Sequence, residues 1–178
     1  MNREAIGKTY PPITYEVGRE KIREYARATL QRNPLYTDSD FAAHSKYGTI
    51  VAPPVFVAVY CGEMFNQIFY DESLGIDLPR IVHGEQEFKF GKVVRSGDTI
   101  TSVAQVLDVF TKSSSSGVTL EFGVVKTESK NQKGRIVCEG IWTFVERGIE
   151  GGEPDGSRHF SLIGICRFTT PAPAEILI

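Results

Sequence analysis

The spacing of apolar residues divides this chain into a helical first half and a second half of strands. Residues 19–30 carry apolar side chains at helical spacing, after a short strand at 14–17 that ends at Gly18, a possible N-cap. Residues 37–47 have the spacing of a capping box followed by a second short helix. Residues 55–70 are apolar nearly all round. Such a helix needs a cover on every side, so the sequence predicts a sheet wrapped around it.

After residue 80 the apolar period changes to alternation, which is typical of strands. Four strands are predicted, at residues 80–90, 99–110, 118–124 and 136–144. Turn residues stand at 96–98 and 131–134, and a serine-rich connection at 112–117. One face of the last strand is expected to hold Ile136, Cys138, Trp142 and Phe144. Long consecutive strands after a buried helix predict an α+β fold with an antiparallel sheet.

Length and charge narrow the class of protein. The chain has 178 residues and a net charge of −2 without any basic run, which fits one domain and argues against a nucleic-acid partner. Cys61, Cys138 and Cys166 are far apart and lack CxxC spacing, so neither a disulfide framework nor a zinc site is expected. We also expect no cofactor and no other metal. Residues 55–59, the longest apolar stretch, are too few to cross a membrane, and residues 1–12 lack the apolar core of a signal peptide. We therefore expect a cytoplasmic protein without a membrane partner.

The last thirty residues differ in composition from the rest. Residues 148–156 are rich in glycine and acidic residues, and the chain beyond them is more apolar than a solvated tail. The sequence thus predicts a single domain over residues 1–147, and a linker with an apolar tail over 148–178. The tail either docks on the sheet, docks on a partner or stays without fixed structure, and its residues indicate no role.

The most informative stretch is residues 30–36, which read Leu-Gln-Arg-Asn-Pro-Leu-Tyr. This stretch resembles the hydratase motif of the MaoC-like hot-dog enzymes, Gly-Asp-x-Asn-Pro-Leu-His, in which Asp and His hold and deprotonate a water. Gln31 stands in place of the Asp and Tyr36 in place of the His. The resemblance therefore implies the frame of a dehydratase site without its acid–base pair.

Other segments extend this resemblance over residues 10–147 and make it closest to the FAS1-like dehydratase branch of the group. They are the stretches at residues 15–26, 50–56, 83–88 and 94–99. The resemblance implies a hot-dog fold, in which two domains pair into a continuous sheet and acyl chains enter between the central helices. In several members one domain of the pair has lost the catalytic residues and holds the acyl tail. The family also uses backbone N–H groups at the start of the central helix against the thioester carbonyl, which corresponds here to Val55 and Phe56.

Individual residues can be weighed against structural alternatives. His83 is the best remaining acid–base candidate, because alternation puts it on the same strand face as Glu85; the alternative is a structural donor or interface residue. Asn33 and Tyr36 either line a residual pocket or shape the turn and pack, and the second interpretation is favoured. A tyrosine is a poor base, since its ordinary pKa is roughly 10. The predicted substrate-binding residues are Asn33, Tyr36, Pro54, Val55, Phe56 and Gln86.

Three functions remain open. The first is the acyl-binding subunit of an (R)-specific enoyl-thioester hydratase or 3-hydroxyacyl dehydratase, paired with a catalytic MaoC-like chain. The second is an active homodimeric dehydratase that uses other residues such as His83. The third is a module that binds acyl-CoA or another apolar ligand without chemistry. The expected ligand is an acyl-CoA or acyl-ACP thioester, and the sequence does not decide between these carriers.

Overall fold

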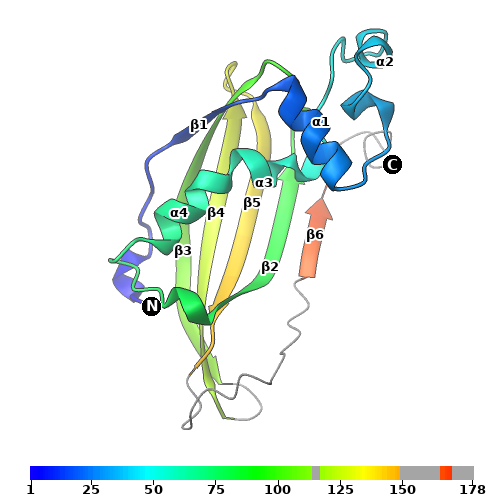
Figure 1. Cartoon of the computed structure of the whole chain (residues 1–178). Helices are drawn as coiled ribbons and strands as arrows, with labels where there is room; N and C mark the ends of the chain where they lie inside the picture. Colours follow the sequence, from blue (N-terminus) through cyan, green and yellow to red (C-terminus); the bar gives the residue numbers. More distant parts are fainter. Residues whose placement is uncertain (114–116, 149–164, 170–178) are drawn as a thin grey trace.

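The computed structural model describes residues 1–113, 117–148 and 165–169, and places helices across one face of a single sheet (Figure 1). The strand order is β1-β3-β4-β5-β2-β6. Neighbours among β1 to β5 pair antiparallel, and β6 pairs with β2 in parallel. The predicted α+β class with an antiparallel sheet is confirmed. The strands are β1 Ile13–Glu16, β2 Ile81–Phe90, β3 Thr99–Ser113, β4 Thr119–Asn131, β5 Ile136–Glu146 and β6 Ile165–Thr169.

The strands extend beyond their apolar alternation, because backbone pairing continues through polar residues. β3 and β4 were predicted to end at residues 110 and 124, but they reach Ser113 and Asn131. Ser113 still pairs with Thr119, so the serine-rich connection is shorter than expected. The predicted turns are confirmed by positive φ angles of 89° at Gly97 and 68° at Gly134. Glycine adopts this left-handed geometry without steric cost.

The first two helices, α1 (Arg19–Ala28) and α2 (Ser39–Ala43), are shorter than predicted. α2 begins after Asp38, whose carboxylate accepts hydrogen bonds from two backbone N–H groups of the first turn at 2.9 and 3.0 Å. The capping-box spacing predicts Thr37 in this role. Asp38 replaces it because a carboxylate is a better N-cap than a threonine hydroxyl.

The helix predicted over residues 55–70 crosses the sheet in two segments, α3 (Val57–Tyr60) and α4 (Gly62–Phe69) (Figure 1). Cys61 between them has a φ of −96° and a ψ of 1°. The Met64 N–H then bonds the Cys61 carbonyl at 3.0 Å, three residues back instead of four. Glycine at the next position lowers helix propensity and favours the interruption here.

Only the sheet-facing side of this central helix is buried. Met64 and Ile68 are each 1% exposed, whereas Val55 is 42% exposed and Tyr70 is 73% exposed. The expectation of a helix wrapped on every side is therefore corrected for the single chain, because the sheet covers one face of the helix and leaves the other open.

Two apolar clusters fill the space between helices and sheet, one around Phe56 and the other around Trp142. Three small polar side chains lie under the interruption of the central helix. The Oγ atoms of Ser102 and Ser129 are 2.7 Å apart, and the Cys61 Sγ lies 3.7 Å from the first and 3.6 Å from the second. All three residues are buried. Their mutual hydrogen bonds satisfy polar atoms that would otherwise be costly beneath the helix.

β5 contains one register shift that alternation does not predict. Between Ser129 and Lys130 of β4, the partner on β5 changes from Cys138 to Ile136, which leaves Val137 as an extra residue. Ile136 is 38% exposed, whereas Val137 is 2% exposed. The prediction that Ile136 shares a strand face with Cys138, Trp142 and Phe144 is therefore wrong, because the bulge turns Ile136 outward.

The N-terminal residues run along the edge of β3 and are anchored by Asp71. The N–H groups of Gly7 and Tyr10 each donate to a carbonyl of β3 at 2.9 Å. Asp71 accepts hydrogen bonds from Lys8 at 2.7 Å, from the Tyr10 hydroxyl at 2.8 Å and from the Ser73 hydroxyl at 2.8 Å. Burial by itself would raise the pKa of Asp71, but hydrogen bonds from Lys8, Ser73 and Tyr10 lower it to about 2.

We expect Gly123→Ala to lower the free energy of unfolding by about 1–3 kcal/mol in urea denaturation. A Cβ at Gly123 would lie 2.3 Å from Cζ of the fully buried Phe144, so the ring would have to move. Gly62→Ala is the matched control, because a Cβ there meets no atom within 4 Å. That control should leave stability unchanged or raise it by up to about 1 kcal/mol. Equal effects of the two substitutions would contradict the steric explanation.

Asp71→Asn should destabilise the protein by about 1–3 kcal/mol at pH 7, because it removes charged hydrogen bonds. The folded-state pKa of about 2 lies below the ordinary value of 3.8, so the stabilisation is fully present above about pH 5 and is lost as the pH falls from 4 to 2. Urea denaturation of both proteins at pH 7, 5 and 3 measures this dependence. The difference between them should shrink at pH 3, and a difference that stays constant would assign the effect to packing.

Candidate functional site

The motif stretch begins where α1 ends in a left-handed turn at Leu30. Leu30 has a φ of 57° and is 83% exposed. Its N–H donates to the Arg27 carbonyl at 3.1 Å, and the Gln31 N–H donates to the Ala26 carbonyl at 2.8 Å. These two bonds form a Schellman motif, which satisfies carbonyls at the end of the helix. The Gln31 side chain, at the position of the family's Asp, is exposed.

The next residues form a capped 3₁₀ turn, Pro34–Tyr36. The Asn33 side chain accepts the Leu35 N–H at 3.0 Å, which supports the interpretation that Asn33 shapes the turn. Tyr36 is fully buried. Burial and then repulsion from Tyr47 raise the pKa of Tyr36 to about 12. Its hydroxyl therefore keeps its proton at neutral pH and cannot activate water.

The proline-led segment before the central helix contacts this turn directly. The Val51 N–H donates to the Leu35 carbonyl at 3.1 Å, and the Tyr25 hydroxyl donates to the Val55 carbonyl at 3.0 Å. Phe56 is fully buried, and its ring centroid lies 5.4 Å from that of Tyr25 in an edge-to-face arrangement. The fold thus brings the motif turn together with the start of the central helix, as the resemblance implies.

The start of the central helix offers few free backbone donors. Pro53 and Pro54 have no N–H, and the Phe56 N–H already donates to the Pro53 carbonyl at 2.9 Å. Within the described residues, the Val55 N–H is the one donor of this turn without a hydrogen bond. The 3₁₀ turn Pro54–Phe56 therefore retains a single group that can polarise a thioester carbonyl.

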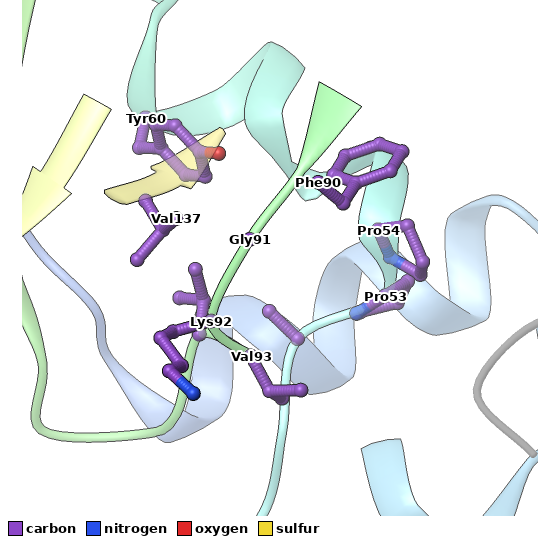
Figure 2. A pocket seen from close by; sticks show the side chains of 10 residues that line it. Pro53, Pro54, Tyr60, Phe90, Gly91, Lys92, Val93 and Val137 are labelled. Atoms are coloured by element: carbon purple, nitrogen blue, oxygen red, sulfur yellow. The ribbon is translucent and has the colours of Figure 1, made fainter. Parts of the chain in front are cut away.

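A small apolar cavity lies beside this turn (Figure 2). Its volume is about 30 Å³, and it is lined by Ala52, Pro53, Pro54, Tyr60, Phe90, Gly91, Lys92, Val93, Val94 and Val137. Pockets that bind organic ligands usually measure roughly 300–1,000 Å³. The single chain in this conformation therefore has no room here for an acyl tail.

His83 and Glu85 do not form the predicted pair. His83 pairs with Phe144 and Glu85 pairs with the adjacent Thr143, so a bulge at Gly84 intervenes. Since adjacent residues of β5 point to opposite faces, the prediction that His83 and Glu85 share a face is wrong. His83 is instead exposed on the inner face, with its ring centroid 6.1 Å from that of Trp142.

These β2 residues also lie away from the motif turn. Phe90, at the far end of β2, lines the cavity beside Pro54. His83 is seven residues earlier, which at about 3.3 Å per residue is on the order of 20 Å along the strand. Gln86 is buried, and its amide donates to the carbonyls of Glu87 at 3.2 Å and Ile141 at 3.1 Å. The amide is thus used within the sheet.

Several residues at the cavity were not predicted from the sequence. Tyr60, Phe90 and Val137 line it, and Tyr25 holds the adjacent turn. The alternation of β2 indicates that Phe90 faces inward, but nothing local links it to Pro54. Among the described residues, no cluster of three metal-ligating side chains occurs, and no helix is long and apolar enough to cross a membrane.

A family model described as "FAS1-like, dehydratase domain region" matches residues 4–140. The chain belongs to this family. A UPF0336 protein of Saccharopolyspora erythraea is 36% identical over 157 residues, which span 88% of this chain and 97% of that relative. The resemblance inferred from residues 30–36 and the flanking stretches is thereby confirmed.

Solved structures agree with the fold of a FAS1-like dehydratase domain. A C-terminally truncated HadBC (3R-hydroxyacyl-ACP dehydratase) complex of Mycobacterium tuberculosis matches with a TM-score of 0.66 and 27% identity, over 79% of this chain and 96% of that chain. A MaoC-like dehydratase of Rhodospirillum rubrum matches with a TM-score of 0.59 and 19% identity, over 82% and 94% of the two chains, which supports the fold alone. The hot-dog fold is thus confirmed.

Leu30→Gly is expected to stabilise this dehydratase domain by up to about 1 kcal/mol, because glycine relieves the left-handed strain while losing backbone entropy. The motif of the family has glycine at this position, and the 83% exposed Leu30 side chain loses little burial. Thermal unfolding measures the change. Leu30→Ala is the control, since alanine keeps the Cβ and should give no gain. If both substitutions shift the melting temperature equally, the strain at Leu30 is not the cause.

Proposed function

We propose that this chain is the acyl-binding, non-catalytic subunit of an (R)-specific enoyl-thioester hydratase or 3-hydroxyacyl dehydratase. The catalytic subunit is a second hot-dog chain that carries the complete Gly-Asp-x-Asn-Pro-Leu-His motif. In hydration, the partner's Asp and His orient a water, whose oxygen bonds to the β-carbon while a proton goes to the α-carbon. Dehydration runs the same steps in reverse.

The observation that carries this proposal is the state of Tyr36. Its side chain stands at the position of the family's catalytic His, but it is fully buried and its pKa is raised to about 12, mainly by burial. Gln31, at the position of the Asp, has an amide that cannot accept a proton usefully. The frame around them is retained through the Asn33 cap and the bond from Val51 to Leu35. A retained frame without a base favours a supporting subunit over an independent enzyme.

The open side of the central helix supports the need for a second chain. Val55 is 42% exposed beside the motif turn, and the cavity behind that turn has a volume of only about 30 Å³. In the proposed complex, the acyl tail lies between this open side and the partner. The resemblance to the HadBC complex at 27% identity fits such an assembly. The bound thioester is an acyl-CoA or acyl-ACP, and Cys61 and Cys138, both buried free thiols, suit a reducing cytoplasm.

The alternative of an independently active enzyme would rest on His83. That residue is exposed on the inner face beside Trp142, but it lies on the order of 20 Å along β2 from the cavity end of the strand. The third alternative, ligand binding without chemistry, predicts thermal stabilisation by an acyl-CoA and no turnover in any mixture.

The test is water addition to crotonyl-CoA, followed by absorbance, for this chain alone, for the full-motif chain of the same genome alone, and for their mixture. We expect the mixture to be faster than the sum of the two separate chains by about 10²-fold or more, because the catalytic chain gains the acyl site that positions the thioester against its acid–base pair. Replacing the motif His of the full-motif chain by Ala should abolish this gain, whereas His83→Ala in this chain should not. Turnover by this chain alone that His83→Ala removes would overturn the proposal.

A further inference from the structure

The sheet has two edges, and the N-terminal residues already occupy one of them. β1 pairs with β3 from Thr99 to Ser102. Residues 7–10 continue this cover, through a bridge from Thr9 to Gln105 and a bond from the Val106 N–H to the Lys8 carbonyl at 2.9 Å. A further chain therefore cannot extend the sheet along this part of β3.

At the other edge of the sheet, the chain's own β6 pairs with half of β2. β6 runs parallel to β2 from Glu85, opposite Ile165, to Lys89, opposite Thr169 (Figure 1). β2 has ten residues, and β6 pairs with five of them. In the described part of the chain, residues 81–84 have no strand on this side. The register shift between His83 and Glu85 separates this open end from the paired half.

We propose that β6 occupies the place of a partner's edge strand, and that the catalytic hot-dog subunit displaces β6 when it pairs with β2. This inference rests on the proposed function, because it assigns the surface through which that complex forms. A strand can accept one further neighbour on each side, so β6 and a partner strand cannot pair with Glu85 to Lys89 at the same time. We assign the partner to β2 rather than to the opposite edge strand β1, because β1 has four residues, whereas β2 has ten.

The pairing geometry favours replacement of β6 by a strand of the partner. Parallel pairing is slightly less stable per residue than antiparallel pairing. A partner strand that pairs antiparallel with all ten residues of β2 gains twice as many pairs as β6 makes. The open end at residues 81–84 gives the partner a place to start before β6 leaves. Until then β6 shields backbone groups of the edge, which would otherwise pair with unrelated strands. β6 thus acts as an intrachain competitor that lowers the fraction of chains ready for the partner.

Hydrogen exchange followed by mass spectrometry tests the displacement directly. In the free chain, amides of β6 and of the half of β2 that pairs with it should be protected. Addition of the full-motif chain of the same genome should expose the amides of residues 165–169 and keep those of residues 85–89 protected. Protection of residues 81–84 should rise at the same time.

A double substitution, Cys166→Pro with Arg167→Pro, isolates the contribution of β6. Adjacent residues of a strand point their N–H groups to opposite sides, so one of the two prolines must remove a bond to β2. The variant should bind the full-motif chain roughly tenfold more tightly or better in sedimentation equilibrium, because β6 no longer reduces the competent fraction. Glu175→Pro, outside β6, is the matched control and should bind like the unmodified chain.

The outcomes distinguish a failure of β6 displacement from a failure of the two-subunit function. If a complex forms while the amides of residues 165–169 stay protected, β6 is not displaced and the inference is overturned, but the two-subunit function stands. If neither the unmodified chain nor the double-proline variant binds the full-motif chain, the proposed complex fails together with its surface. Self-association of the double-proline variant without binding to the full-motif chain would assign the edge to a second copy of this chain and overturn the inference.

Discussion

The packing of the central helix against the inner face of the sheet is the contact on which the other elements depend. The rings of Phe65 and Phe69 on α4 meet Trp142 edge-to-face at centroid distances of 4.8 and 5.3 Å. Phe144 fills the space next to them and leaves no room for a Cβ at Gly123. Burial of such apolar area supplies most of the driving force for folding, at about 25 cal/mol per Å². The central helix crosses the middle of the sheet (Figure 1), so its position fixes the turns attached to its ends.

The interruption at Cys61 connects this packing to the candidate site. Ser102 and Ser129 form a small hydrogen-bonded patch below it, where larger side chains would hold the helix away from the sheet. α3 then continues toward the 3₁₀ turn that contains Phe56, and the Tyr25 hydroxyl holds the carbonyl of that turn. The packing of the central helix therefore determines the position of the 3₁₀ turn at the candidate site. The substitutions at Gln31 and Tyr36 remove the acid–base groups without disturbing this geometry, because the turn around them depends on Asn33 and on backbone bonds.

Two surfaces of the described chain lack a full cover. They are the open side of the central helix and the edge of β2, of which β6 covers half. Both are consistent with an assembly in which a second hot-dog chain completes the sheet and the substrate site. Before that assembly forms, β6 protects the edge through five backbone pairs. β2 therefore has two roles. Its inward side chains pack into the core, and its backbone forms the edge that a partner would extend.

The sequence by itself determined the fold class, the family and the missing acid–base pair. These follow from local signals: alternation in β2 to β5, the proline before the central helix, and the types of residue at positions 31 and 36. The tertiary structure decided the register. The bulges at Gly84 and Val137 reverse the faces of His83 and Ile136 relative to simple alternation, because one extra residue shifts every neighbour beyond it. Two further contacts are seen only in the tertiary structure. Phe90 lies at the cavity beside Pro54, and β6 pairs with β2. Such contacts join residues far apart in the chain, and their free energy depends on the space between packed elements, which no local pattern of residues specifies.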